Sequence, residues 1–158
     1  MEKPKRRPGD RKDGRLLREL DPMHFIMPQI YPNRCDNEAY ISEKMLDGGF
    51  PKVSYEASKI LLARSEDKSN KDYDTLRDKA REPTLFRAAE ACYRIEDYST
   101  ALSLYKKLLE ERPNSGYFFE CKFQMSGCKQ RLSPPDYEGA LADLAEVFTW
   151  TKSTGQQN

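Results

Sequence analysis

The chain of 158 residues has no long apolar run, and it contains one histidine and one tryptophan. A membrane-spanning helix needs about 18–20 consecutive apolar residues, so we expect no membrane helix and no membrane partner. No apolar stretch follows the basic residues near the start, so a secretory signal is not expected. Four cysteines in a chain without such a signal are typical of free thiols in a reducing compartment. We therefore expect a cytoplasmic protein.

Catalytic and metal-binding patterns are also scarce. His24 has no acid or nucleophile pattern around it, so Ser-His-Asp and Cys-His catalysis lack support. Cys121 and Cys128 are seven residues apart, two turns along one helical face, whereas zinc sites show closer pairs such as CxxC. Buried structural thiols are favoured over metal ligands. No glycine loop with a following lysine and hydroxyl residue is present to hold a phosphate. We expect no enzyme activity, no cofactor and no metal.

Charge is distributed unevenly, although the formal net charge is only +1. Residues 1–15 contain seven Lys/Arg and three Asp/Glu, and the rest of the chain contains 20 and 23. A basic arm can contact phosphate-rich partners, but this one has no aromatic residue to stack on bases. A solvated, disordered arm is favoured, and nucleic-acid contact is the less favoured alternative.

Residues 85–113 are predicted to form two helices joined by a tight turn. Apolar and small residues recur at three- and four-residue intervals, which places them on one face of each helix. Asp97 can cap the second helix, and Pro113 cannot continue it. Alanines at the crossing let the two axes approach closely, with Tyr98 and Tyr105 filling the space beside them. The patterned residues are Leu85, Ala88, Ala89, Cys92, Ala101, Leu104, Tyr105, Leu108 and Leu109.

Residues 82–115 span the length of one tetratricopeptide repeat, about 34 residues, and resemble that family in their small, aromatic and proline positions. The segment Asp97–Leu102 (DYSTAL) returns 39 residues later as Asp136–Leu141 (DYEGAL). The extra length is expected in the turn-forming residues 131–135 (RLSPP). For residues 53–152 the resemblance implies an all-α fold of stacked helical hairpins. A generic helical hairpin is the alternative.

The other segments are assigned by composition. Three prolines interrupt residues 16–49, which we expect to be irregular. The run Gly48-Gly49-Phe50-Pro51 marks a boundary, after which residues 50–152 form the repeat domain. Within it, residues 53–81 are interpreted as a degenerate hairpin that packs on the first full repeat or caps the array. Residues 153–158 are polar and are expected to be a disordered tail.

A second resemblance covers residues 9–47. They look like the N-terminal segment of a bacterial family related to chloramphenicol acetyltransferase and the 2-oxo-acid dehydrogenase acyltransferases. That family uses the histidine of an HxxxD motif as a general base, whereas His24 precedes Phe-Ile-Met-Pro. No catalytic residue is carried over, so the resemblance implies a fragment of such an enzyme. The matching motifs are Arg11-Lys12-Asp13-Gly14, Pro32-Asn33-Arg34, Asp36 and Glu38.

In tetratricopeptide proteins the first helix of each repeat lines a concave face, and a partner-binding site is expected there. Aromatic and charged residues at helical spacing supply buried area and directed hydrogen bonds at interfaces. Repeats that clamp a C-terminal carboxylate have lysine and asparagine where Phe86 and Glu90 stand here, so that ligand is not expected. The candidate site residues are Phe86, Arg87, Glu90, Tyr93, Arg94, Tyr117, Glu120 and Gln124.

The predicted function is a non-enzymatic interaction module that binds a protein partner, as a peptide or a helix, on this concave face. An equally weighted alternative is that the candidate residues only pack against the N-terminal segment or a second copy. Because about three repeats are usually needed for a stable array, self-association is a further expectation. The competing function is the acyltransferase-like enzyme fragment.

Overall fold

The computed structural model describes the backbone of residues 34–155 and the side chains of residues 38–149. This part of the chain is all-α, as predicted, and contains no strand. The elements in order are α3 (Arg34–Asp47), α4 (Pro51–Glu66), α5 (Tyr73–Thr75), the π-helical turn η2 (Leu76–Ala80), α6 (Arg81–Arg94), α7 (Tyr98–Glu111), α8 (Phe118–Arg131) and α9 (Tyr137–Gly155).

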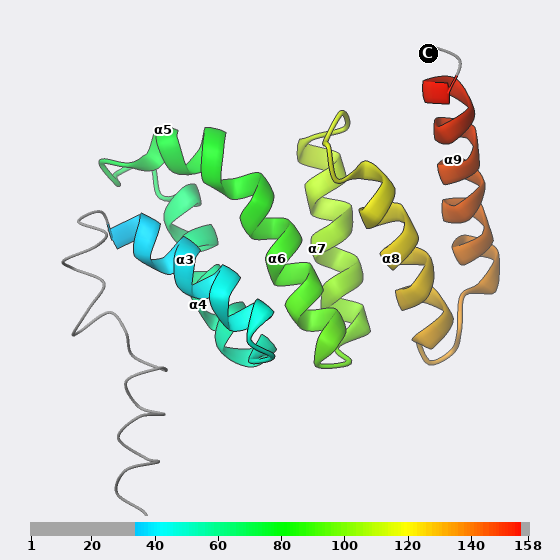
Figure 1. Ribbon diagram of the computed structural model, residues 1–158, viewed down its shortest axis with the longest axis horizontal. Helices are drawn as coiled ribbons and strands as arrows, with labels where there is room; N and C mark the ends of the chain where they lie inside the picture. Colours follow the sequence, from blue (N-terminus) through cyan, green and yellow to red (C-terminus); the bar gives the residue numbers. More distant parts are fainter. Residues whose placement is uncertain (1–33, 156–158) are drawn as a thin grey trace, which may run out of the picture.

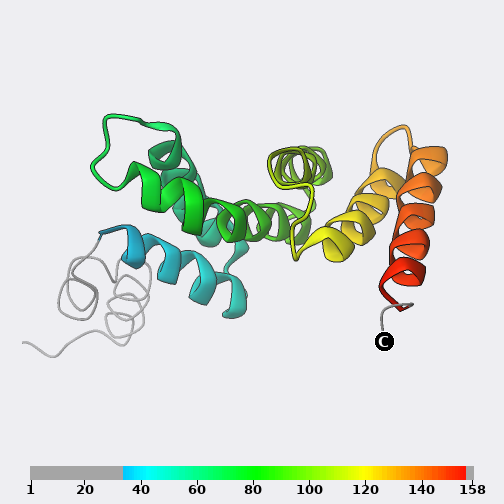
Figure 2. The ribbon, with the colours of Figure 1, turned by 90° about the horizontal axis from the view of Figure 1, so that it is seen from above.

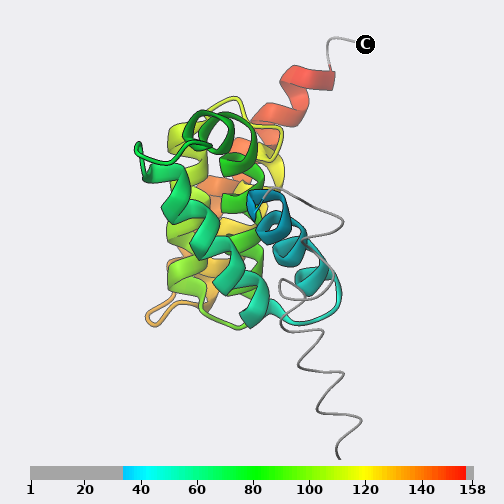
Figure 3. The same cartoon turned by 90° about the vertical axis from the view of Figure 1, so that its left-hand side faces the viewer.

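The helices form hairpins that are stacked in a row, which we call the array (Figure 1). Helix α3 pairs with α4, α6 with α7, and α8 with α9. Successive hairpins meet where α4 packs on α6 and where α7 packs on α8. Figure 2 shows α3 on one side of α6 and α4 and α7 toward the other, with α8 beginning on the side of α3. We call the side lined by α3, α6 and α8 the concave face. Figure 3 views the array from its α3–α4 end.

Small residues allow α6 to pack closely against its neighbours. Ala88, Ala89 and Ala91 are fully buried on α6, and Ala101 is fully buried on α7. Ala101 lies in one core cluster with Leu85, Ala89 and Cys92 of α6. The predicted alanine contact between these two helices is therefore confirmed, with Tyr105 fully buried in the same cluster.

The predicted ends of α7 are also confirmed. The Asp97 carboxylate accepts a hydrogen bond from the Thr100 N–H at 3.1 Å and so caps the helix. Asp136 accepts from the Gly139 N–H at 2.8 Å in the second copy of the motif. Helix α7 ends at Glu111, before Pro113.

Residues 34–47 were expected to be irregular and are instead the helix α3. The interrupting prolines at 22, 28 and 32 all precede this helix, so they cannot prevent it from forming. Gly48 and Gly49 form the turn into α4, with Gly49 at φ 82° and Phe50 N–H donating to Met45 O at 2.7 Å. Positive φ is accessible to glycine without a steric penalty.

The degenerate hairpin expected at residues 53–81 packs on the first full repeat through the contact of α4 with α6, but it is not a unit of its own. Its first helix, α4, pairs with α3, and residues 73–94 run on through α5, η2 and α6 without a turn. Pro83 lies in the first turn of α6, where a missing N–H is tolerated. The expected tail also differs, because α9 continues to Gly155.

Predictions for the basic arm, for His24 and for most of the acyltransferase-like segment lie outside the described residues. So do those for residues 156–158. No helix in residues 34–155 is both long enough and apolar enough to cross a membrane.

Candidate protein-interaction site

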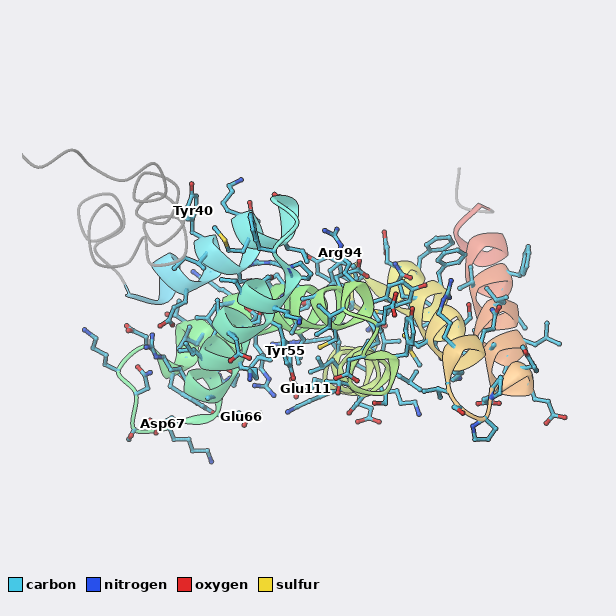
Figure 4. The ribbon with its side chains drawn as sticks, turned by 90° about the horizontal axis from the view of Figure 1, so that it is seen from below. Tyr40, Tyr55, Glu66, Asp67, Arg94 and Glu111 are labelled. Carbon is cyan, nitrogen blue, oxygen red and sulfur yellow. The ribbon has the colours of Figure 1, made fainter. Side chains whose placement is uncertain are left out.

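The two candidate arginines of α6 bind the neighbouring helix α3. The Arg87 guanidinium donates to Ala39 O at 2.9 Å and to Ser42 Oγ at 3.4 Å. The exposed Arg94 donates to Leu46 O at 2.7 Å, near the C-terminal end of α3, where free carbonyls attract cations. Figure 4 shows Arg94 on the side of α6 between α3 and α8. The expected alternative, packing against the N-terminal segment, thus applies to both arginines.

Arg87 completes a polar contact between α3 and α4. Ser54 Oγ donates to Ser42 O at 2.6 Å, and Ser58 Oγ donates to Ser42 Oγ at 3.1 Å. All three serines are fully buried. Buried hydroxyls need such partners, because an unsatisfied one costs about 1–3 kcal/mol. Removing Arg87 would therefore weaken the attachment of α3.

We expect Arg87→Ala to lower the free energy of unfolding by about 1–2 kcal/mol, since it removes charge-assisted hydrogen bonds to the buried side of α3. Hydrogen–deuterium exchange should increase in residues 34–47 and remain unchanged in α8 and α9. Lys52→Ala, at an exposed position of α4, is the matched control. Unchanged exchange in α3 would show that Arg87 does not hold this helix in solution.

Phe86 and Tyr117 join two hairpins. Their rings are stacked with centroids 4.4 Å apart and an angle of 14° between the planes. Phe86 also makes an edge contact with Tyr105, at 6.2 Å and 61°. The Tyr105 hydroxyl donates to Glu90, and burial is the main cause that raises the pKa of Tyr105 far above its ordinary value. The candidate residues Phe86, Glu90 and Tyr117 are half-buried, and their contacts connect α6, α7 and the start of α8.

Tyr93 fills the contact between the C-terminal parts of α6 and α8. Its ring packs edge-on against Tyr98 at 5.4 Å, and the Arg131 guanidinium lies 5.6 Å from its centroid. A Cβ added at Gly127 would lie 3.0 Å from the Tyr93 hydroxyl oxygen, so the small residue leaves room for the ring. Tyr93 is therefore also half-buried and mainly joins two hairpins.

The last two candidates lie on α8, where Glu120 is exposed and Gln124 is half-buried. The candidate residues did not include their neighbours Phe119 and Phe123. Both are exposed, at 37% and 55%, and their rings lie parallel with centroids 6.5 Å apart. Phe119 and Phe123 each lie two residues from Cys121, which places them on the opposite side of the helix from the buried Cys121 and Met125. This spacing could have predicted from the sequence that both phenylalanines are exposed.

The eight candidates therefore do not form one open strip. The structure brings Phe86 and Tyr117 together at a helix junction and uses Arg87 and Arg94 to hold α3. The exposed apolar surface of the concave face is on α8, opposite its buried face. Cys121 and Met125, on the opposite face of α8, lie in the core cluster with Tyr105 and Leu108 of α7, so Phe119 and Phe123 lie on the face of α8 away from α7.

The three cysteines whose side chains the structure describes do not provide reactive chemistry. Cys92, Cys121 and Cys128 are free and fully buried in one core cluster. Burial raises the pKa of Cys92 to about 11 and those of Cys121 and Cys128 to about 12, so the thiols stay protonated near neutral pH. The predicted structural thiols are confirmed at these positions. Among the described residues no group of His, Cys, Asp and Glu side chains is placed to hold a metal ion.

No protein-family model, curated protein or solved structure matches this chain. The tetratricopeptide and acyltransferase resemblances therefore stay predictions. The site has to be judged from the contacts and exposure of its own residues.

Proposed function

We propose that this protein is a non-enzymatic interaction module of the tetratricopeptide-like type, which binds a segment of a partner protein on its concave face. The observation that carries the proposal is the exposed, stacked pair Phe119–Phe123 on α8. Aromatic side chains with few rotatable bonds are typical anchors of protein interfaces. The proposed site is centred on this pair, with Glu120 and Gln124 beside it on the same helix.

The organisation of the array supports this assignment. Stacked hairpins leave the outer face of a first helix such as α8 uncovered along its length. Phe86, Tyr93 and Tyr117 fill the contacts between the neighbouring helices, so the helix that carries this surface is held in place by packed aromatic rings. A rigid support lowers the entropic cost of binding. The chemistry fits a peptide or helix that presents an apolar side chain to the phenylalanines and polar groups to Glu120 and Gln124.

The test uses a peptide library displayed on phage and selected against the full chain. We expect the selected peptides to share an apolar anchor and to bind the Phe119→Ala/Phe123→Ala protein at least about tenfold more weakly, a loss of about 1.4 kcal/mol or more. Fluorescence polarisation with synthetic peptides would measure this difference.

Ile60→Ala is the matched control, because Ile60 is 46% exposed and lies on α4, away from the concave face. Its affinity for the selected peptides should equal that of the unmodified protein. Equal binding by the double phenylalanine variant would place the binding site elsewhere and contradict the proposal.

A further inference from the structure

The last helix carries an apolar stripe that its own hairpin does not cover. Tyr137, Leu141, Leu144 and Phe148 follow one another at four-, three- and four-residue intervals and so share one face of α9. Tyr137 is 68% exposed, and Leu141 and Phe148 are each 69% exposed. The face that packs toward α8 lies beside this stripe and includes the buried Ala140 and Val147.

The repeated motif shows what such a stripe does elsewhere in the molecule. With Asp97 aligned to Asp136, the stripe corresponds to residues 98, 102, 105 and 109 of α7. There Leu102 is only 8% exposed and Tyr105 is fully buried, in a cluster that includes Cys121, Met125 and Cys128 of α8. On α9 the corresponding Tyr137, Leu141 and Phe148 stay exposed, and Leu144 between them is half-buried. The stripe has the composition of a helix–helix contact.

At the opposite end of the array, the described side chains of α3 do not form a matching apolar stripe. On α3, Glu43, Lys44 and Asp47 are exposed, and covering an apolar stripe with such charges would be costly. A head-to-tail contact between two copies is thus disfavoured. An antiparallel pairing of two α9 helices instead places each stripe on the other. Leu141 then lies opposite Phe148 of the second copy, and the two-fold symmetry axis of the pair passes near Leu144.

The charges along α9 favour the same orientation. Its acidic residues Glu138, Asp143 and Glu146 precede its one basic residue, Lys152. Asp143 and Glu146 already pair with Lys122 of α8, so the exposed Glu138 is the acidic residue that remains for a second copy. An antiparallel pair brings the acidic end of one helix to the basic end of the other, and it also opposes the helix dipoles favourably. Helix α9 extends past the N-terminal end of α8, so its last turns protrude from the array (Figure 1).

We propose that Tyr137, Leu141, Leu144 and Phe148 form a self-association surface, which binds the same stripe of a second copy in an antiparallel, two-fold symmetric pair. A two-fold contact is closed, so association stops at the dimer. The stripe is short, and small interfaces are usually weak. The dimer is therefore expected to form at protein concentrations on the order of 1–100 µM.

Sedimentation velocity of the full chain across that range tests the proposal. The sedimentation coefficient should rise from a monomer to a dimer value, and Leu141→Glu should weaken association at least about tenfold. Ile60→Glu, which places the same charge on an exposed apolar residue of α4, should leave it unchanged. A monomer at every concentration, or undiminished dimerisation of Leu141→Glu, would overturn the proposal.

A charge exchange tests the orientation. Glu138→Lys should weaken the dimer by about threefold or more, and adding Lys152→Glu should restore it, because the two ends are then complementary again. If the Glu138→Lys/Lys152→Glu variant did not dimerise more tightly than Glu138→Lys, the antiparallel pairing would be contradicted. Assemblies larger than a dimer would contradict it as well. Far-UV circular dichroism shows whether each variant is folded. Leu141→Glu should bind concave-face peptides normally, so failure of this inference is distinguishable from failure of the proposed function.

Discussion

Leu102→Ala is expected to lower the free energy of unfolding by about 2–4 kcal/mol, whereas Leu141→Ala should lower it by less than about 0.5 kcal/mol. The two leucines occupy the same position in the repeated motif, Asp-Tyr-x-x-Ala-Leu. Leu102 is 8% exposed because α8 packs on α7, and Leu141 is 69% exposed because no described helix covers that side of α9.

Urea denaturation followed by circular dichroism would measure both values. The protein should be held below about 1 µM, so that the proposed dimer does not add stability. Alanine has a higher helix propensity than leucine, so neither change weakens its helix and the difference reports packing alone. Similar losses at the two positions would mean that α9 is covered as completely as α7.

Arg81→Met is the second change with a large expected effect, a loss of about 2–3 kcal/mol. The Arg81 side chain is 10% exposed, and its Nε and Nη2 donate to the two carboxylate oxygens of Glu111 at 2.6 and 2.7 Å. It also donates to Ser65 Oγ at 2.6 Å and to Glu66 Oε1 at 3.0 Å. This one side chain therefore connects α4, α6 and α7, and its partners Glu66 and Glu111 lie on the side of the molecule away from Arg94 (Figure 4).

The size of this effect follows from what the substitution leaves behind. Breaking a buried ion pair costs about 3–5 kcal/mol when the remaining charge stays buried. Here the side chains of Glu66 and Glu111 are 55% and 33% exposed, so water can solvate both and the loss is smaller. Arg77→Met, in the preceding helical turn at an exposed position, is the control and should change stability little.

The same cluster gives the loss a pH dependence. Hydrogen bonding to Arg81 lowers the pKa of Glu111, and hydrogen bonding to Lys107 and Arg81 lowers the pKa of Glu66. A carboxylate with a lowered folded-state pKa contributes stability above its unfolded pKa, near 4.5, and the contribution is lost as the pH falls through the folded value. The stability difference between the unmodified protein and Arg81→Met should therefore shrink as the pH is lowered from about 5 to 3. If the stability difference did not change with pH, the loss of stability in Arg81→Met would come from packing and not from the ion pairs.

Local sequence was sufficient for features that depend on neighbouring residues in the chain. The Asp97 cap and the end of α7 before Pro113 were predicted correctly because a cap needs only the next helical turn. The buried stripe that contains Ala101 was predicted from three- and four-residue spacing. The thiols of Cys121 and Cys128 were placed on one buried helical face by the same periodicity.

Features that depend on distant partners were predicted less well. Four described residues of α3 are buried, namely Glu38, Ile41, Ser42 and Leu46, and the hydrogen-bond partners of Glu38 and Ser42 come from α4 and α6. Arg87 and Arg94 looked available for a ligand because the two carbonyls that bind them, in Ala39 and Leu46, are 48 residues away in the chain. A spacing pattern on one helix carries no information about such partners.

The sequence by itself determined where α7 begins and ends and which residues of α6 and α7 can be buried, because capping and helical periodicity act over a few residues. Only the tertiary structure decided which of these faces are covered. Leu102 and Leu141 lie in nearly identical local sequences, yet α8 packs over the first and leaves the second open. Whether a residue is buried depends on the neighbouring helix as much as on the residue itself. Both proposed surfaces of this protein, on α8 and on α9, are helix faces that no described helix covers.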